Sequence, residues 1–280
     1  MDLKTLQETP PWDWPEDAGD FLLEILRDRD KGTSAADRLL AAELVGDSPV
    51  MNNELAEALM AIAGSGSEPE DLRATAAISL GPVLEQSDLD GFDDPDDLPI
   101  TEKTFHAIQE LLHKLYLDEG NSKELRRRFL EAAVRAPQDW QTSVVRTAYS
   151  SGDKDWMLTA VFAMSRVPGF DDQIMDALEN ADPEIHYEAV NSAGARELEA
   201  AWPHIVALIQ EPSTPKDLLI AAIEAIGYIR PKDAEEILSD LARSSDEEIA
   251  DAVSESIAMS QALSGEVDGL EDVDEGGWVN

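Results

Sequence analysis

The side chains best suited to catalysis or metal binding are four histidines in a chain with sixty acidic residues. Neither a Ser-His-Asp arrangement nor a glycine-rich phosphate loop occurs in a convincing context, and carboxylates repeated along helices are usually solvated. The nearest approach to adjacent metal ligands is His186-Tyr-Glu188. The sequence therefore predicts no catalytic residue, no metal site and no cofactor. The histidines are His106, His113, His186 and His204.

An aspartate-rich segment, Asp88-Leu-Asp-Gly-Phe-Asp93, is the second candidate for chemistry. An EF-hand calcium loop needs oxygen ligands at its first, third and fifth positions and glycine at its sixth. Here Phe92 occupies the fifth position and Asp93 the sixth, so the segment fails the pattern. Only weak, nonspecific binding of divalent ions is compatible with it.

Charge narrows the choice of partner. The 280 residues include 21 basic and 60 acidic side chains, which gives a net charge of −39 and a pI near 4.1. Arg126-Arg-Arg128 with Arg135 is the one basic cluster, and the chain stays strongly negative even without its two most acidic segments. Such a field repels phosphate backbones and anionic lipids and attracts basic proteins, although acidity also serves solubility alone. We expect a protein partner with a basic surface, no nucleic acid and no membrane.

The compartment is predicted from what the sequence lacks. There is no cysteine, so disulfides, thiolate catalysis and zinc-finger spacings are excluded. Residues 1–10 have no apolar core like that of a signal peptide, and no apolar run is long enough to span a bilayer. We expect a cytoplasmic protein, and the sequence does not predict its oligomeric state.

A short alanine-rich helix recurs along the chain and must position any site. In its clearest copy Thr214 caps the helix, Pro215 occupies the first turn and Gly227 closes the run. Most copies end about thirty residues apart, a period typical of helical repeats, and one interval is longer by about twenty. The other copies are Ala41–Gly46, Ala76–Gly81, Phe129–Val134, Ala160–Ser165, Ala189–Gly194 and Ala252–Ile257.

Two further patterns support this register. The residue five positions before the start of each copy is acidic in six of the seven copies, and the exception is Ala36. A carboxylate at this position lies in the first helical turn, where it interacts favourably with the helix dipole. Longer amphipathic stripes with helical spacing, such as Phe105, Ile108, Leu112 and Leu115, lie between the copies. The unit is an antiparallel helix pair, and the chain is expected to be all-α with about seven pairs. The acidic positions are Asp71, Glu124, Asp155, Glu184, Asp217 and Glu247.

Three segments fall outside the repeats, which span residues 19–263. Residues 1–18 are predicted to cap the first repeat, with Trp12 and Trp14 covering its open core. Residues 85–101 are predicted to be an acidic loop insertion, and residues 264–280 a disordered acidic tail, because both are highly charged and rich in glycine or proline.

The segment Arg73-Ala-Thr-Ala-Ala-Ile-Ser-Leu-Gly81, with Asp71 before it, resembles the second helix of HEAT repeats. It is most similar to the short bacterial class that also occurs in phycobilin-lyase subunits, and the resemblance covers residues 19–261. It implies a right-handed α-α superhelix, a HEAT/armadillo-like solenoid, whose second helices line a concave, partner-binding face. Arg38 and Arg126 match Arg73, but the other copies have no arginine there. HEAT-type deoxyhypusine hydroxylases bind two irons through His-Glu dipeptides, and this chain has none.

If the second helices line a concave face, two columns of residues point toward it. We expect Phe162 to act as an apolar anchor and the glutamates to select cations; the alternative is a solvated surface with Phe162 packed between repeats. The function predicted is a non-catalytic adaptor that binds another protein. A phycobilin-lyase-like subunit, which attaches or detaches a bilin, and an acidic mimic of nucleic acid are the alternatives. The candidate partner-binding residues are Glu43, Glu131, Phe162, Glu188, Asn191 and Glu224.

Overall fold

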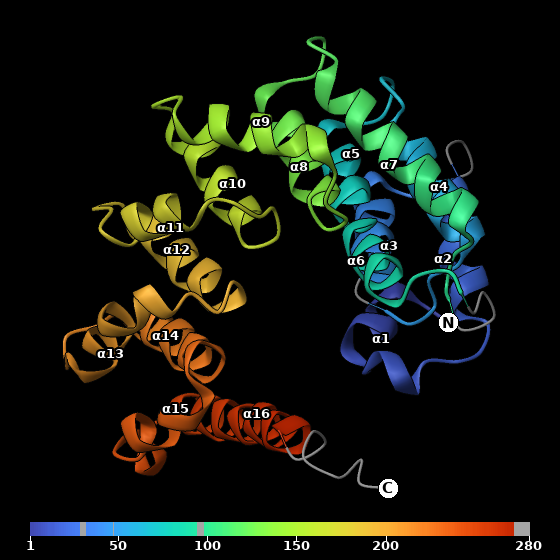
Figure 1. Ribbon diagram of the computed structural model, residues 1–280. Coiled ribbons are helices and arrows are strands. Elements are labelled where there is room, and N and C mark those ends of the chain that lie inside the picture. Colours follow the sequence, from blue (N-terminus) through green and yellow to red (C-terminus); the bar gives the residue numbers. More distant parts are fainter. Residues whose placement is uncertain (29–31, 47, 94–97, 272–280) are drawn as a thin grey trace, which may run out of the picture. The chain divides into compact units, whose positions relative to one another are not determined.

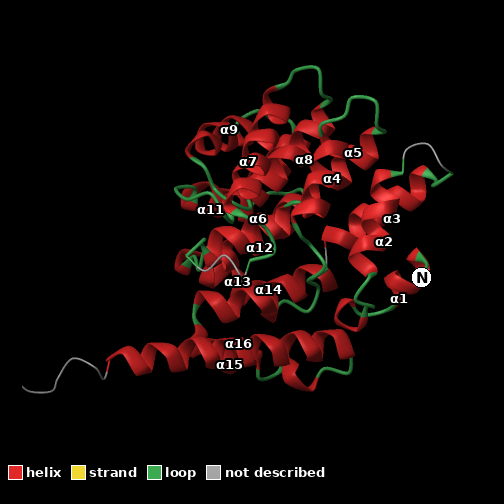
Figure 2. Cartoon of the chain, turned by 90° about the vertical axis from the view of Figure 1, so that its right-hand side faces the viewer, coloured by secondary structure: helices red, strands yellow, loops and turns green. Residues whose placement is uncertain are grey.

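The computed structural model describes residues 1–28, 32–46, 48–93 and 98–271. Helices joined by loops make up this part of the chain, and it contains no strand (Figure 2). The chain divides into two compact units, Met1–Gln141 and Thr142–Asn280. The predicted all-α class of stacked helix pairs is confirmed within each unit.

The first unit contains three helix pairs. The first helices α2 (Ala18–Arg27), α4 (Asn53–Ala63) and α7 (Glu102–Leu117) each pack on the helix that follows as its partner, α3 (Ala35–Gly46), α5 (Glu70–Ile78) or α8 (Lys123–Ala133). The second helices also stack on one another, α3 on α5 and α5 on α8 (Figure 1). Two helices lie outside the pairs, α1 (Leu3–Glu8) and α6 (Gly81–Asp90).

The second unit repeats this arrangement. Its second helices α10 (Lys154–Met164), α12 (Pro183–Ala195), α14 (Lys216–Ile229) and α16 (Glu247–Glu271) stack in chain order. The first helices α11 (Asp171–Leu178), α13 (Trp202–Gln210) and α15 (Pro231–Leu238) pack on α12, α14 and α16. With α9 (Asp139–Tyr149) before α10, the described residues follow the order of the seven predicted pairs.

Three of the four glycines that end the repeated helices, Gly46, Gly194 and Gly227, lie against the next second helix. A Cβ atom added at Gly46 would lie 2.8 Å from the Cα of Ser79, and one at Gly194 would lie 2.8 Å from the Cα of Ala225. At Gly227 the nearest atom would be the Ser256 hydroxyl, at 2.7 Å. Each partner stands about thirty residues further along, one repeat away. Glycine is therefore needed because the neighbouring helix occupies the space of a side chain.

The predicted loop at residues 85–101 is partly wrong. Residues 85–90 belong to α6, which begins with Pro82 in its first turn and buries Val83 and Leu84. That apolar face packs on α8 despite the acidic residues around it, so counting charges missed the helix. Phe92 then contacts the Phe105 ring, with centroids 5.3 Å apart, and residues 94–97 lie outside the described residues.

The two predicted end segments also differ in part from the structure. Helix α1 buries Leu3 and Leu6 and packs on α3, as expected of a cap. The Trp14 indole N–H donates to the carbonyls of Leu6 and Thr9, whereas Trp12 is 80% exposed, so the covering role predicted for Trp12 is wrong. At the other end α16 runs to Glu271, past the predicted boundary at 264, and residues 272–280 lie outside the described part.

We expect the substitution Gly194→Ala to lower the free energy of unfolding by about 1–3 kcal/mol, because the added methyl group meets the backbone of α14. Gly265→Ala is the matched control, since Gly265 lies in α16 with open space around it. Alanine there should be neutral or stabilising, because it favours a helix by about 1 kcal/mol over glycine. Urea denaturation of both variants measures the difference, and equal stabilities would contradict the close helix approach.

Candidate functional site

The arginines shared by the first repeats bind the protein's own backbone. Arg38 donates to the Leu26 carbonyl at the end of α2, Arg73 to the Ala63 carbonyl at the end of α4, and Arg126 to the Tyr116 carbonyl near the end of α7. The last carbonyls of a helix have no partner inside the helix, and a cation there also favours the helix dipole. These three side chains therefore join the two helices of each pair.

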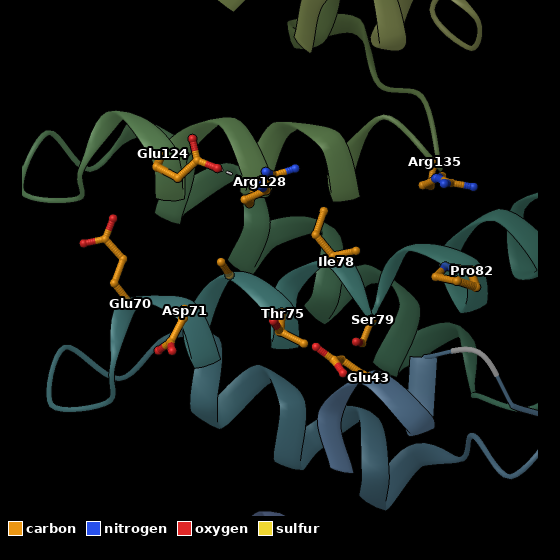
Figure 3. A pocket seen from close by; sticks show the side chains of 11 residues that line it. Glu43, Glu70, Asp71, Thr75, Ile78, Ser79, Pro82, Glu124, Arg128 and Arg135 are labelled. Carbon is orange, nitrogen blue, oxygen red and sulfur yellow. Dashed lines mark hydrogen bonds and ion pairs between the residues drawn. The ribbon is translucent and has the colours of Figure 1, made fainter. Parts of the chain in front are cut away.

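An open groove of about 650 Å³ lies on the second helices of the first unit, and we call it the α5 groove (Figure 3). No residue of the first helices lines it, so it lies on the side of the stack that they leave open. Figure 3 shows Ile78 and Thr75 of α5 between Arg128 of α8 and Glu43 of α3. Its lining residues are Glu43, Glu70, Asp71, Ala74, Thr75, Ile78, Ser79, Pro82, Glu124, Arg128 and Arg135.

Internal ion pairs neutralise the cations of the α5 groove. Arg128 donates to Glu124 at 2.9 Å and to Glu131 at 2.8 Å. Burial alone would lower the pKa of Arg128, but these two carboxylates outweigh it and raise the pKa. Arg135 is paired in the same way with Glu85. Glu43 is exposed, and no cation among the described residues forms an ion pair with it, so the groove presents surplus negative charge.

A second open groove, of about 510 Å³, lies on α10, α12 and α14 of the second unit, and we call it the α12 groove. Its walls come from one side chain of α10, from the first half of α12 and from the start of α14. We call its apolar lining residues Leu158, Tyr187 and Leu218 the floor, and its three charged lining residues, all acidic, the rim. The lining residues are Leu158, Pro183, Glu184, Tyr187, Glu188, Pro215, Asp217 and Leu218.

The predicted partner-binding residues are distributed over both units. Glu43 lines the α5 groove and Glu188 the α12 groove. Glu131 is buried beneath Arg128, so it acts on the surface only through that arginine. Phe162 is half-buried, with the Arg166 guanidinium 5.0 Å from its ring centre.

Glu131 and Phe162 line neither groove, and the same holds for Asn191 and Glu224. Asn191 is half-buried on α12. Glu224 lies on the exposed side of α14. Its pKa is raised, first by the partial burial of its carboxyl group and second by repulsion from Glu255.

The prediction missed the large apolar side chains of the α12 groove. Tyr187 is 40% exposed, and Leu158 and Leu218 lie beside it on the floor of the groove. A signal was present, because Tyr187 stands next to the predicted Glu188 and four residues before Asn191, on the same helical face. A column that takes one residue per repeat cannot include it, since a groove between helices is lined by several residues of each.

His186 and His204 form the closest group of candidate metal ligands. Their Nε2 atoms lie 2.9 Å apart, and His204 Nδ1 lies 3.4 Å from a Glu179 carboxylate oxygen. Burial, followed by the neighbouring His204, lowers the pKa of His186, and Glu179 only partly opposes this. In the described residues no three histidine or carboxylate side chains are placed to hold a metal ion. That part of the chain also has no helix both long enough and apolar enough to cross a membrane.

Comparison with known proteins gives likeness of fold alone. No family model matches the chain, and no curated protein does. Among solved structures, human deoxyhypusine hydroxylase in complex with glycerol is 16% identical with a TM-score of 0.40, covering 93% of this chain and 88% of its own. YibA of E. coli is 17% identical with a TM-score of 0.43, covering 89% and 84%. An engineered protein is 17% identical with a TM-score of 0.34, covering 89% and 98%.

We expect Arg38→Met to lower the free energy of unfolding by about 3–5 kcal/mol, because it breaks a buried ion pair with Glu68 and the hydrogen bonds to the Leu26 carbonyl. The two side chains are only 8% and 7% exposed and share two hydrogen bonds of 2.7 and 3.0 Å. Arg27→Met is the matched control, because the Arg27–Glu54 pair is exposed and such pairs contribute at most about 1 kcal/mol.

Thermal and chemical denaturation report the effect of both arginine substitutions. Adding Glu68→Leu to Arg38→Met should recover part of the loss, because the buried carboxylate that bonded to Arg38 is then removed as well. Equal, small effects of Arg38→Met and Arg27→Met would show that Arg38 does not stabilise the packing of α3 on α2.

Proposed function

We propose that this chain is a non-catalytic scaffold that binds another protein through the open faces of its second helices. The repeats use their first helices and their arginines to build the stack, which leaves the second helices as the available surface. The observation that carries the proposal is the chemistry of the two grooves on that surface. Each combines a partly exposed apolar side chain, Ile78 or Tyr187, with acidic neighbours.

The proposed partner is a protein with a basic surface. Glu43 in one groove and Asp217 in the other are exposed carboxylates, and the chain as a whole carries a net charge of −39. A field of this sign speeds the approach of a basic partner and disfavours phosphate backbones and anionic membranes. The apolar side chains supply the contact area that charge alone does not provide.

Two finer assignments belong to the same proposal. We propose that the repeats belong to the short bacterial class of HEAT repeats, and the recurring acid, alanine pair and glycine support this. A cytoplasmic location is part of the proposal, and the absence of cysteine from the sequence suits it. Both can be tested independently of the binding experiment.

The test is affinity capture from the native host with the tagged full chain and two charge-reversed variants. The first variant carries Glu43→Lys, Glu188→Lys and Glu224→Lys, all on second helices. The second carries Glu57→Lys, Glu110→Lys and Glu235→Lys, which are exposed positions on the first helices α4, α7 and α15. Both variants change the net charge equally, so bulk electrostatics cannot explain a difference between them.

We expect the wild-type chain and the first-helix variant to capture the same basic protein, and the second-helix variant to lose it. Binding at raised salt should weaken without disappearing, because apolar contacts persist when charges are screened. Equal capture by both variants, equal loss from both, or the absence of any stoichiometric protein partner would contradict the proposed function.

A further inference from the structure

We infer that the α12 groove binds a peptide segment that presents one large apolar side chain flanked by lysines or arginines. This inference rests on the proposed scaffold function and adds to it the groove used and the chemistry of the bound segment. The first argument is the floor of the groove. Leu158 of α10, Tyr187 of α12 and Leu218 of α14 meet there, with Pro183 and Pro215 at the starts of α12 and α14.

The apolar floor has the character of an anchor site. Tyr187 is 40% exposed, and Leu158 and Leu218 are half-buried, although most apolar side chains of these helices are fully buried in the core. Aromatic side chains in such positions contribute strongly to binding, because they offer a large apolar area at a small cost in conformational entropy. A segment that covers them gains free energy from apolar burial.

The rim of the groove selects the charge of that segment. Glu184, Glu188 and Asp217 are the charged residues that line it, and all three are acidic. Two lysines close to the groove in sequence are paired with carboxylates, and one of these carboxylates is Glu184 of the rim. Lys154 bridges Asp182 and Glu184, and Lys216 bridges Asp246 and Glu248.

These lysine contacts have a consequence for the groove. The hydrogen bonds raise the pKa of both lysines, so each remains a paired cation. Lys154 offsets part of the charge of Glu184, but the lining itself holds no cation among the described residues, so flanking lysines or arginines on the bound segment meet acidic side chains.

The volume and charge of the groove distinguish this occupant from others. A hollow of about 510 Å³ accommodates one large side chain with its neighbours, whereas a folded domain needs a broader contact. A phosphate-bearing ligand is repelled by the rim. The chain's own last residues, 272–280, include Trp278 but also three carboxylates and no cation, so their charge opposes binding here.

The test measures fluorescence anisotropy with the full chain and a labelled synthetic peptide whose central leucine–tryptophan pair is flanked on both sides by lysine and arginine. Two control peptides replace the apolar pair by serines or the basic residues by glutamates. Tyr187→Ser removes the proposed anchor contact. Tyr228→Ser is its matched control, since Tyr228 lies on α14 outside the groove and is 39% exposed.

We expect the basic apolar peptide to bind with a Kd at least about tenfold tighter than either control peptide. Tyr187→Ser and Asp217→Lys should each weaken binding by at least about tenfold, and Tyr228→Ser by less than about twofold. A chain ending at Glu271 should bind as the full chain does. Tighter binding by that shortened chain would identify the C-terminal segment as the occupant and overturn the inference.

Two other outcomes also overturn it, and they separate it from the proposed function. If Ile78→Ser in the α5 groove abolishes peptide binding while Tyr187→Ser does not, the α12 groove is the wrong site but the scaffold function stands. If no peptide binds but affinity capture still yields a partner that depends on the second-helix glutamates, the segment chemistry is wrong and the function again stands. Failure of both experiments removes both claims.

Discussion

The close approach of successive second helices is the constraint on which the rest of the structure depends. A glycine on one helix faces a serine or alanine of the next, as at Gly194 and Ala225, with no room for another methyl group. Two serine hydroxyl groups also form hydrogen bonds between neighbouring second helices. Ser192 donates to the Val161 carbonyl at 2.8 Å, and Ser256 donates to the Ile223 carbonyl at 2.6 Å. Small residues thus allow the backbones of neighbouring second helices to come into contact. This contact fixes the offset between the helices, and the offset determines which residues face the grooves.

The placement of charge follows from this stacking. Cations are few in this chain, and several of them join one repeat to the next. Arg38 reaches Glu68, Lys154 reaches Asp182 and Glu184, and Lys216 reaches Asp246 and Glu248, each about one repeat further along. Because these contacts occupy the cations, the exposed faces of the second helices retain mainly carboxylates. The grooves are therefore acidic partly because several of the few cations form ion pairs between successive repeats.

Much of the fold could be predicted because it depends on local patterns. The glycine register, the acidic first turn and the amphipathic stripes identify α5, α12 and α14 from sequence alone. Helix α6 was missed because burial of Val83 and Leu84 on a neighbouring helix outweighs the acidic residues around them. Trp12 and Trp14 look alike in sequence, and only the packing of α1 decides that Trp14 has hydrogen-bond partners.

The candidate site was less predictable, because it depends on distances between repeats. The two predicted columns include Glu43 and Glu188, each of which lines a groove, but they also include Glu131, which is buried and bonded to Arg128. Tyr187 was absent from the predicted set because the groove draws residues from three helices and takes more than one residue from α12 and from α14. The lateral offset between those helices is a tertiary property, set by contacts such as that between Gly194 and Ala225.

The most direct measurement of the central claim is a double-mutant cycle on unfolding free energy at Gly227 and Ser256, which stand one repeat apart in sequence. Gly227→Ala should be destabilising because its methyl group meets the Ser256 hydroxyl, and Ser256→Ala because it loses the bond to Ile223. In the double variant the hydroxyl is gone, so the account predicts a loss smaller than the sum of the two by about 0.5–3 kcal/mol. Strict additivity would mean that the two helices do not meet there and would contradict the stacking.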